Sequence, residues 1–495
     1  MSKIVIIGGG IAGLSAGIYA KLAGFDAEIF EKNSLPGGEC TGWNRKGYHI
    51  DNCIHWLTGT RKDTDLYETW KTVGALSDDT KYAAVTSFYS TEYNGQRATF
   101  WTDLDRTRDE LIALSPEDTD EINKMVEYVE YSRQCQLPVK KPMEMFGVRD
   151  YIDMGKEMAD FPKVMKEFGK VSLYDYSLRF KHPLIQKMLV DYLPGKYCAY
   201  SFFVSYATIA DGNGNIPLGA SLQMSFRMEK RFKDLGGIIN YGKSADKICM
   251  EGKSATGILL EDGSHIKADY VISAVDTHVL FNRLMPKTYM PRALKTAYEN
   301  EECYPINSGF QSAFSVPLSF DIGETVFVGI EPTKVGQNTY DRMCIKSYNY
   351  DPVYINGDRC VIQTNIGQND SDFAYWKSLS KEDYKMKKEE LTDSIIKQII
   401  KLYPELEGNI EHLDTWTPLT YDRYCCAYRG SYMSFMTTPG GKQVSINGRI
   451  KGAQNVLISG QWTYSPGGLP VAVASGKFAV QRICKILKKD INIKG

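Results

Sequence analysis

The first fifty residues constrain the fold more than any other stretch of the chain. An apolar run without a polar face, residues 4–7, predicts a strand that is buried on both sides of a parallel sheet. The pattern Gly8-x-Gly10-x-x-Gly13 follows directly and leads into a segment rich in Ala, Gly and Leu, 11–23, which predicts a helix. Such glycines allow a tight turn and bring backbone N–H groups up to a pyrophosphate at the helix N-terminus.

A glycine pair lies just beyond this unit. Residues 26–30 predict the next strand, and Glu31 follows 18 residues after Gly13, where an acid accepts hydrogen bonds from a ribose diol. Gly37 and Gly38 mark another place where the backbone must come close to a ligand. A nicotinamide dinucleotide needs no contact there, whereas a longer cofactor has a second half to be held.

The C-terminal segment repeats the same design. Residues 455–460 predict a strand that ends in glycine, and the turn at 466–470 leads into a helix at 471–487. A further buried strand, 268–275, ends on small residues. Free N–H groups at a second helix N-terminus would stabilise the charge that builds up at the N1–C2=O edge of a reduced flavin. Together the three pieces predict FAD rather than NAD.

Composition narrows the classes of partner. The 495 residues carry a net charge of −1, so no strong field favours nucleic acid. The eleven cysteines show no metal-ligand spacing and there are only six histidines, so we expect no metal site. We find no apolar run of about 18 residues, and a strand starting at residue 3 leaves no room for a signal peptide. A cytoplasmic protein with reduced thiols is predicted.

Two long insertions separate the nucleotide-binding pieces. The first predicts helices at 65–73, 115–133 (with Ser115 and Asp118 as a capping box), 148–168 and 183–193. The second predicts strands at 307–316, 325–330, 343–349 and 359–367 and a long helix at 381–402. Aromatic clusters at 197–203 and 421–432 indicate either an apolar tunnel or ordinary core. The helical region 148–193 indicates either solvated helices or a peripheral contact with a membrane surface.

These motifs resemble the FAD-dependent phytoene desaturase, carotenoid isomerase and retinol saturase group of the flavin amine oxidase superfamily. The resemblance rests on the glycine pattern with Glu31, the Gly37-Gly38 loop leading to Asp51, the strand 271–274, Thr417-Pro418 with Arg429-Gly430, and Gly460-Gln461 with the turn 466–470. It implies an α/β fold with a discontinuous, Rossmann-like FAD-binding domain of the GR2 type and an α+β substrate domain built from two insertions. We expect the FAD-binding parts at 1–62, 214–282 and 452–495, and the substrate domain at 63–213 and 283–451.

The resemblance also implies the cofactor contacts. Residues expected to bind FAD are Gly8, Gly10, Ile11, Ala12 and Gly13 around the pyrophosphate, Glu31 and Lys32 near the ribose, Gly37, Gly38 and Thr41 toward the flavin, Ala245 at the adenine, Gly460 and Gln461 along the ribityl chain, and Gly468, Leu469 and Pro470 at the ring. Glu39 departs from the group, because many relatives have arginine there; either Arg45 replaces that charge or the pyrophosphate is bound without it. Gln461 stands where an acid is common. The turn has no cysteine, so a non-covalent flavin is expected.

The expected activity is that of an FAD-dependent oxidoreductase acting on C–C bonds of a hydrophobic polyene, isoprenoid or lipid-like substrate, with hydride transfer at flavin N5. A desaturase, a saturase and a redox-neutral isomerase all fit. The alternative is an FAD-dependent amine oxidase, which an aromatic pair flanking the flavin and an acidic cavity mouth would favour. A non-catalytic carrier on the same fold is disfavoured, because the flavin-binding glycines are intact.

Three further side chains have two interpretations each. His55 is the candidate catalytic residue, as a proton donor or acceptor beside the reacting carbon, or a structural histidine bonded to a backbone carbonyl. Asp51 is expected to orient a hairpin rather than to do chemistry. Arg429 is either a structural ion-pair partner or an anchor for a substrate carboxylate or a flavin carbonyl. The sequence does not predict the oligomeric state.

Overall fold

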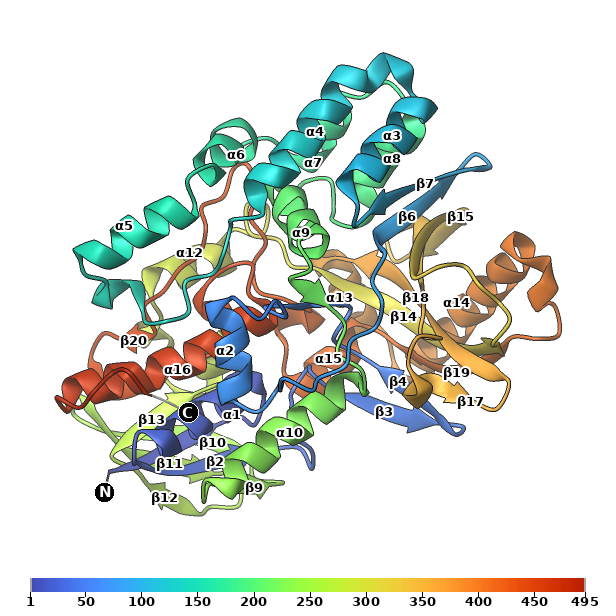
Figure 1. Cartoon of the computed structure of the whole chain (residues 1–495). Coiled ribbons are helices and arrows are strands. Elements are labelled where there is room, and N and C mark those ends of the chain that lie inside the picture. Colours follow the sequence, from blue (N-terminus) through green and yellow to red (C-terminus); the bar gives the residue numbers. More distant parts are fainter. Residues whose placement is uncertain (1, 494–495) are drawn as a thin grey trace.

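Segments from three distant parts of the chain build the central sheet. The computed structural model describes residues 2–493 and contains a six-stranded sheet with the order β20-β21-β13-β1-β2-β9 (Figure 1). Its strands are β1 Lys3–Ile7, β2 Asp26–Glu31, β9 Ile238–Tyr241, β13 Tyr270–Ser273, β21 Ala453–Ile458 and β20 Arg449–Ile450. All neighbours are parallel except β20, which pairs antiparallel with β21. The three predicted strand-and-glycine pieces therefore share one sheet.

Alternation along the strands separates two cores on the faces of this sheet. Ile4 and Ile6 of β1 pack with α1 (Ile11–Leu22), α10 (Ala220–Asp234) and α16 (Gly468–Ile486). Val5 and Ile7 face the other way, toward the sheet β10-β11-β12 (Ala245–Glu251, Ser254–Leu260 and His265–Lys267). A strand buried on both faces has no polar side, which explains the continuous apolar run in the sequence.

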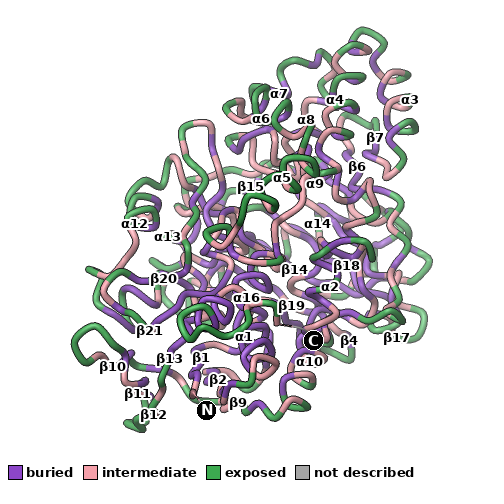
Figure 2. The backbone as a smooth tube through the Cα atoms, turned by 60° about the vertical axis from the view of Figure 1, so that its left-hand side comes forward, coloured by how far each residue is buried: buried purple, intermediate pink, exposed green. Residues whose placement is uncertain are grey.

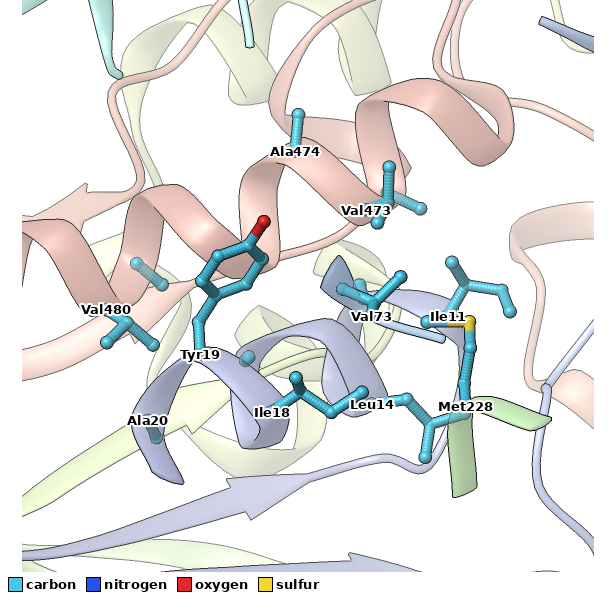
Figure 3. Close-up of a cluster of buried hydrophobic side chains, with 14 of the residues drawn as sticks. Ile11, Leu14, Ile18, Tyr19, Ala20, Val73, Met228, Val473, Ala474 and Val480 are labelled. Carbon is cyan, nitrogen blue, oxygen red and sulfur yellow. The ribbon is translucent and has the colours of Figure 1, made fainter. Parts of the chain in front are cut away.

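Helices α1 and α16 pack unusually close together. A Cβ atom on Gly476 would lie 2.5 Å from the Ala12 carbonyl oxygen, so only glycine fits there. Ser15 Oγ donates a hydrogen bond to the Val473 carbonyl oxygen at 2.7 Å. Figure 3 shows Tyr19 of α1 reaching toward α16 near Val480, while Leu14 lies beside Met228 of α10. The contact between α1 and α16 holds two glycine-rich turns, one before each helix, on the same side of the molecule.

Both insertions contribute to a second, larger sheet. Its order is β19-β14-β18-β16-β15-β6-β7, with β17 pairing on β18. The strands are β6 Ser87–Tyr93 and β7 Gln96–Trp101 from the first insertion, and β14 Ser308–Pro317, β15 Thr325–Val335, β16 Asn338–Ser347, β17 Ile355–Asn356, β18 Arg359–Gln368 and β19 Glu411–Trp416 from the second. Leu391, Ile395 and Ile399 of α14 (Lys381–Leu402) belong to the core on this sheet, as their helical spacing predicts.

The remaining helices lie around the two sheets. The first insertion forms α2 Asp65–Thr72, α3 Leu104–Leu114, α4 Thr119–Ser132, α5 Val148–Glu157, α6 Phe161–Phe168, α7 Leu173–Ser177, α8 Pro183–Asp191 and α9 Tyr200–Ala210. Elsewhere lie α11 Thr277–Val279, α12 Arg292–Glu299, α13 Asp370–Ser378, α15 Pro418–Cys425, the hairpin β3–β4 (Gly42–Arg45 and Tyr48–Asp51) and the pair β5–β8 (Leu57–Thr58 and Gly214–Asn215). Figure 2 shows buried residues concentrated along β1, α1, β14 and β18. Across residues 2–493, no helix combines the length and apolar character needed to cross a membrane.

The first insertion differs from its predicted elements in three places. The expected helix 148–168 is two helices, because Pro162 cannot continue α5 and instead occupies the first turn of α6. Helix 115–133 begins only at Thr119, and the expected capping box is absent: Asp118 accepts Ser115 Oγ and the backbone N–H groups of Lys181 and His182. The aromatic cluster at 197–203, for which no helix was predicted, belongs to α9 from Tyr200 onward.

Candidate functional site

The first glycine turn is closed tightly by its own backbone. A Cβ on Gly13 would lie 1.9 Å from the Gly8 carbonyl oxygen, so α1 can begin directly against β1 only with glycine at this position. Gly37 N–H donates to the Gly9 carbonyl oxygen at 2.9 Å. The Glu31 carboxylate accepts a hydrogen bond from Gly9 N–H at 2.7 Å. The acid, the first turn and the glycine pair thus form one compact cradle.

The second glycine turn is held by side-chain oxygens. Gln461 Oε1 accepts a hydrogen bond from Gly468 N–H at 3.0 Å, and Ser475 Oγ accepts one from Gly460 N–H at 2.7 Å. Gly460, Gly467 and Gly468 all have positive φ values, of 130°, 88° and 79°. A side chain at these positions would be strained. Gln461 therefore shapes the turn in place of the acid common in the related group.

Both turns open into one cavity of about 1530 Å³. The N-cap residues of α1 and α16, Gly10 and Gly467, make no side-chain cap, and neither helix has an acid in its first turn. Their N-terminal ends therefore present N–H donors and positive helix-dipole charge to the cavity at two places. Single ligand pockets usually measure about 300–1,000 Å³, so this volume has room for a long cofactor and a substrate. The cradle, the two helix ends and the size of the cavity fit FAD.

Most of the predicted cofactor residues meet in this cavity. Those lining it are Gly8, Gly10, Ile11, Ala12, Glu31, Lys32, Gly37, Gly38, Ala245, Gly460, Gln461, Gly468, Leu469 and Pro470, and His55 lines it as well. Gly13 and Thr41 do not belong to its wall: Gly13 supports the turn from behind, and Thr41 is buried beside it. The contact of each with FAD remains a prediction.

The suggestion that Arg45 replaces a missing cofactor-binding charge is wrong. Its guanidinium pairs with Asp414 at 2.9 Å on an exposed part of the β3–β4 hairpin.

Asp51 accepts hydrogen bonds from Ser221 N–H at 2.7 Å and the Tyr354 hydroxyl at 2.8 Å, so it fixes the hairpin. Arg429 is paired with Asp370 at 2.9 Å and also with Glu301.

Two acids that were not predicted to bind the cofactor lie in the site, Glu39, which is half-buried, and Asp276, which is buried. Glu39 and Asp276 both line the cavity. Burial, and then the charge of Asp276, raise the pKa of Glu39 to about 8. Burial raises the pKa of Asp276 to about 7, although the N–H groups of His278 and Tyr428 donate to it. Asp276 follows the carboxyl end of β13, and ligands bind at the ends of parallel strands, which is the signal that would have found it.

We predict that Glu39 makes FAD retention sensitive to pH. Near neutrality Glu39 is largely protonated, whereas above its pKa of about 8 a half-buried carboxylate would repel an anionic diphosphate. FAD occupancy after exhaustive ultrafiltration should therefore fall between pH 7 and pH 9. Glu39→Gln should lose less FAD than wild type over this range, with the remaining loss due to ionisation of Asp276, while Glu28→Gln near the surface should behave like wild type. An equal loss from Glu39→Gln would contradict this role.

His55 lies beside a buried lysine on β16. The Lys346 ammonium donates to the His55 carbonyl oxygen at 3.0 Å and lies 3.4 Å from His55 Nδ1. The residue is exposed by surface area and lines the cavity, although protein atoms pack densely around its ring. Burial and the Lys346 charge lower the pKa of His55 to about 3, and burial lowers the pKa of Lys346 to about 8. His55 is therefore neutral at pH 5 to 8 and can act only as an imidazole.

This pKa predicts a pH effect on stability. The unfolded chain takes up a proton at His55 near pH 6.5, whereas the folded chain does so only near pH 3. Because the unfolded state binds more protons between these values, stability rises with pH across this window. His55→Gln should show a shallower rise in Tm from pH 4 to 6.5 than wild type. Identical slopes would mean that His55 already carries a proton in the folded protein.

The geometry defines a class of protein, a dinucleotide-binding flavoprotein with a second sheet over the cofactor cavity. The model of the family described as flavin containing amine oxidoreductase matches residues 11–484, so the chain belongs to this family, and FAD is its cofactor. The resemblance stated from the motifs is confirmed.

Individual relatives are distant. A neurosporene-forming phytoene desaturase from Cereibacter sphaeroides is 24% identical over 57% of this chain and 54% of its own length. A 4,4'-diaponeurosporene oxygenase from Staphylococcus aureus (strain MW2) is 20% identical over 97% of both chains. Among solved structures, cyclohexylamine oxidase from Brevibacterium oxydans IH-35A is similar with a TM-score of 0.59 at 13% identity, covering 99% of this chain and 100% of the other. At this identity the structural likeness shows the fold.

Proposed function

We propose that this protein is an FAD-dependent oxidoreductase that acts on C–C bonds of a long apolar substrate, as a desaturase, saturase or isomerase. Bound FAD supplies the exchange of a hydride with a substrate carbon at flavin N5. The observation that carries the proposal is that the cavity does not end at the glycine turns. It continues along aromatic and aliphatic side chains that include Trp56, Phe88, Val204, Phe327 and Met436.

This chain's residues would hold the substrate by shape and exclude water. Met154 of α5, Met158 between the two helices and Phe161 of α6 line the cavity. On α5, Val148 is 79% exposed and Ile152 is 52% exposed. An apolar substrate could enter at this side, and the same helix offers the peripheral membrane contact considered above. The polyene names of the two relatives support an apolar substrate.

We also propose the division into domains given above. The sheet shared by β1, β2, β9, β13 and β21 supports FAD-binding parts at 1–62, 214–282 and 452–495, with its edge strand β20 (Arg449–Ile450) lying just before the last boundary. The sheet shared by β6, β7 and β14–β19 supports one substrate domain from 63–213 and 283–451.

An amine oxidase is the second candidate. Tyr421 and Tyr432 line the cavity with ring centroids 5.2 Å apart and planes at 71°, and both hydroxyls accept hydrogen bonds from Gln311. Such an aromatic pair was the expected mark of amine oxidation, and a solved relative is an amine oxidase.

The two candidates differ in their products. The purified protein should be incubated with carotenoid and retinoid polyenes and, separately, with mono- and diamines. We expect polyenes with altered double bonds and no hydrogen peroxide from amines. Peroxide release with an amine, without any change in a polyene, would reverse the choice.

A further inference from the structure

Lys346 places an ammonium group without a carboxylate partner in the wall of the cavity. It lies on β16 opposite Gln363 of β18, and the residue is 5% exposed. Its hydrogen-bonding contacts are the carbonyl oxygen and Nδ1 of His55. Within the described part of the chain, 2–493, no Asp or Glu oxygen comes within 4.0 Å of Lys346 Nζ.

The neighbouring charged groups make their direct contacts with other residues. Arg342, Cys344 and Lys346 alternate along β16 and all line the cavity. Arg342 is paired with Asp191 at 2.6 Å. Asp51 is the acid with the largest effect on Lys346, and its charge favours the charged form of the lysine. The Asp51 carboxylate instead accepts hydrogen bonds from Ser221, Cys53 and Tyr354. Of these two cations on β16, Lys346 alone is left without an anion.

Aromatic rings lie close to this ammonium, and Lys346 Nζ is 5.2 Å from the centre of the Tyr348 ring. Trp56 follows His55 and donates from its indole N–H to the Tyr192 hydroxyl at 3.2 Å, so each polar tip has a partner. Phe327 on β15 lies opposite Cys344. A buried unpaired charge is costly, and one beside aromatic walls lacks the water that would compensate it. A hydrocarbon occupant leaves that cost in place, an amine adds a like charge, and an anion removes it.

We propose that Lys346 anchors a carboxylate at one end of a long apolar substrate, so that the enzyme acts on a polyene or lipid-like acid. This rests on the proposed function and adds the head group of its substrate. His55 is a positioning residue for this contact, because its carbonyl oxygen holds the ammonium. The acid would form a charge-assisted hydrogen bond with Lys346, and the apolar chain would extend along Trp56, Tyr192 and Phe327.

The test compares one polyene chain with and without its charge. The fluorescent tetraene cis-parinaric acid and its methyl ester are titrated into the FAD-loaded full-length protein. Wild type should bind the acid about 10- to 100-fold more tightly than the ester. Lys346→Met, which keeps the length of the side chain, should lose that preference, whereas Lys346→Arg should keep most of it. FAD content and Tm, measured for each variant, establish that the fold and the cofactor are intact.

Three other results would contradict the proposal that Lys346 binds the substrate carboxylate. Equal binding of acid and ester, no binding of either, or an unchanged preference in Lys346→Met would each do so. Loss of FAD from Lys346→Met alone would assign the ammonium to the cofactor instead.

Anaerobic flavin spectra separate this inference from the proposed function. A Lys346-dependent preference for the acid without any flavin response to polyene acids would support the anchor and contradict C–C redox chemistry. Equal flavin responses to acid, ester and hydrocarbon would support C–C redox chemistry and contradict the anchor.

Discussion

Replacing Glu31 by alanine is expected to weaken FAD binding by about 10- to 100-fold. The side chain is 6% exposed and its oxygens accept hydrogen bonds from Gly9 N–H at 2.7 Å and Asn33 N–H at 2.8 Å. A carboxylate has about four acceptor positions, so lone pairs remain for a ribose diol. Alanine would remove this acceptor and also leave the Gly9 N–H in the cradle without its partner. Titration of the apo-protein with FAD, followed by flavin fluorescence, measures the change.

A matched control is available on the same strand. Glu28 pairs with Lys3 at 2.6 Å near the surface, and its side chain is 20% exposed. Glu28→Ala should leave FAD affinity within about twofold of wild type, because a surface ion pair contributes little. If Glu31→Ala and Glu28→Ala bound FAD equally well, the ribose would have to lie elsewhere.

Arg342→Ala should destabilise the folded protein by about 3–5 kcal/mol, because it breaks a buried ion pair. The Arg342 Nε and Nη2 atoms donate to the Asp191 carboxylate at 2.8 and 2.6 Å. The Asp191 side chain is 1% exposed and ends α8, so this pair fastens the helical insertion to β16. Without Arg342, Asp191 would be a buried anion with only the Thr91 hydroxyl as a side-chain donor. Urea unfolding of the holoprotein measures the loss.

The control for this prediction is an exposed pair. Arg108→Ala removes the partner of Asp105 within α3 and should change the free energy of unfolding by less than about 1 kcal/mol. If Arg342→Ala also changed it by less than about 1 kcal/mol, the helical insertion would not depend on the pair. Burial raises the pKa of Asp191 even though the Arg342 charge lowers it. A small change in stability would therefore mean that Asp191 takes up a proton when Arg342 is removed.

The nucleotide-binding part could be predicted because its signals are local. A buried strand, three glycines and an acid lie within about thirty residues, and the physical reasons for their spacing do not depend on the rest of the chain. The helix 381–402 was equally clear from its apolar stripe. In contrast, α9 is apolar nearly all round, since Phe202, Phe203 and Tyr206 are all buried, and it therefore lacks the polar face that marks a helix.

Other parts were missed although a signal existed. The hairpin β6–β7 turns at Asn94-Gly95, whose φ values of 51° and 73° belong to the turn that this dipeptide favours. The far wall of the cavity had no such signal. Lys346 is an ordinary lysine on a strand until the fold brings it to His55, 291 positions away in sequence. Contacts of this kind depend on how two insertions fold over the cofactor, and no local pattern encodes them.

Anaerobic absorbance spectroscopy of the FAD-loaded protein tests the central claim most directly. The oxidised protein, and a second sample reduced chemically, are mixed with carotenoid polyenes, polyene acids and amines. Our account predicts that a polyene or polyene acid bleaches the oxidised flavin or restores the reduced one, or is isomerised by the reduced enzyme, and that amines leave both spectra unchanged. Rapid bleaching by an amine, with every polyene inert, would contradict it.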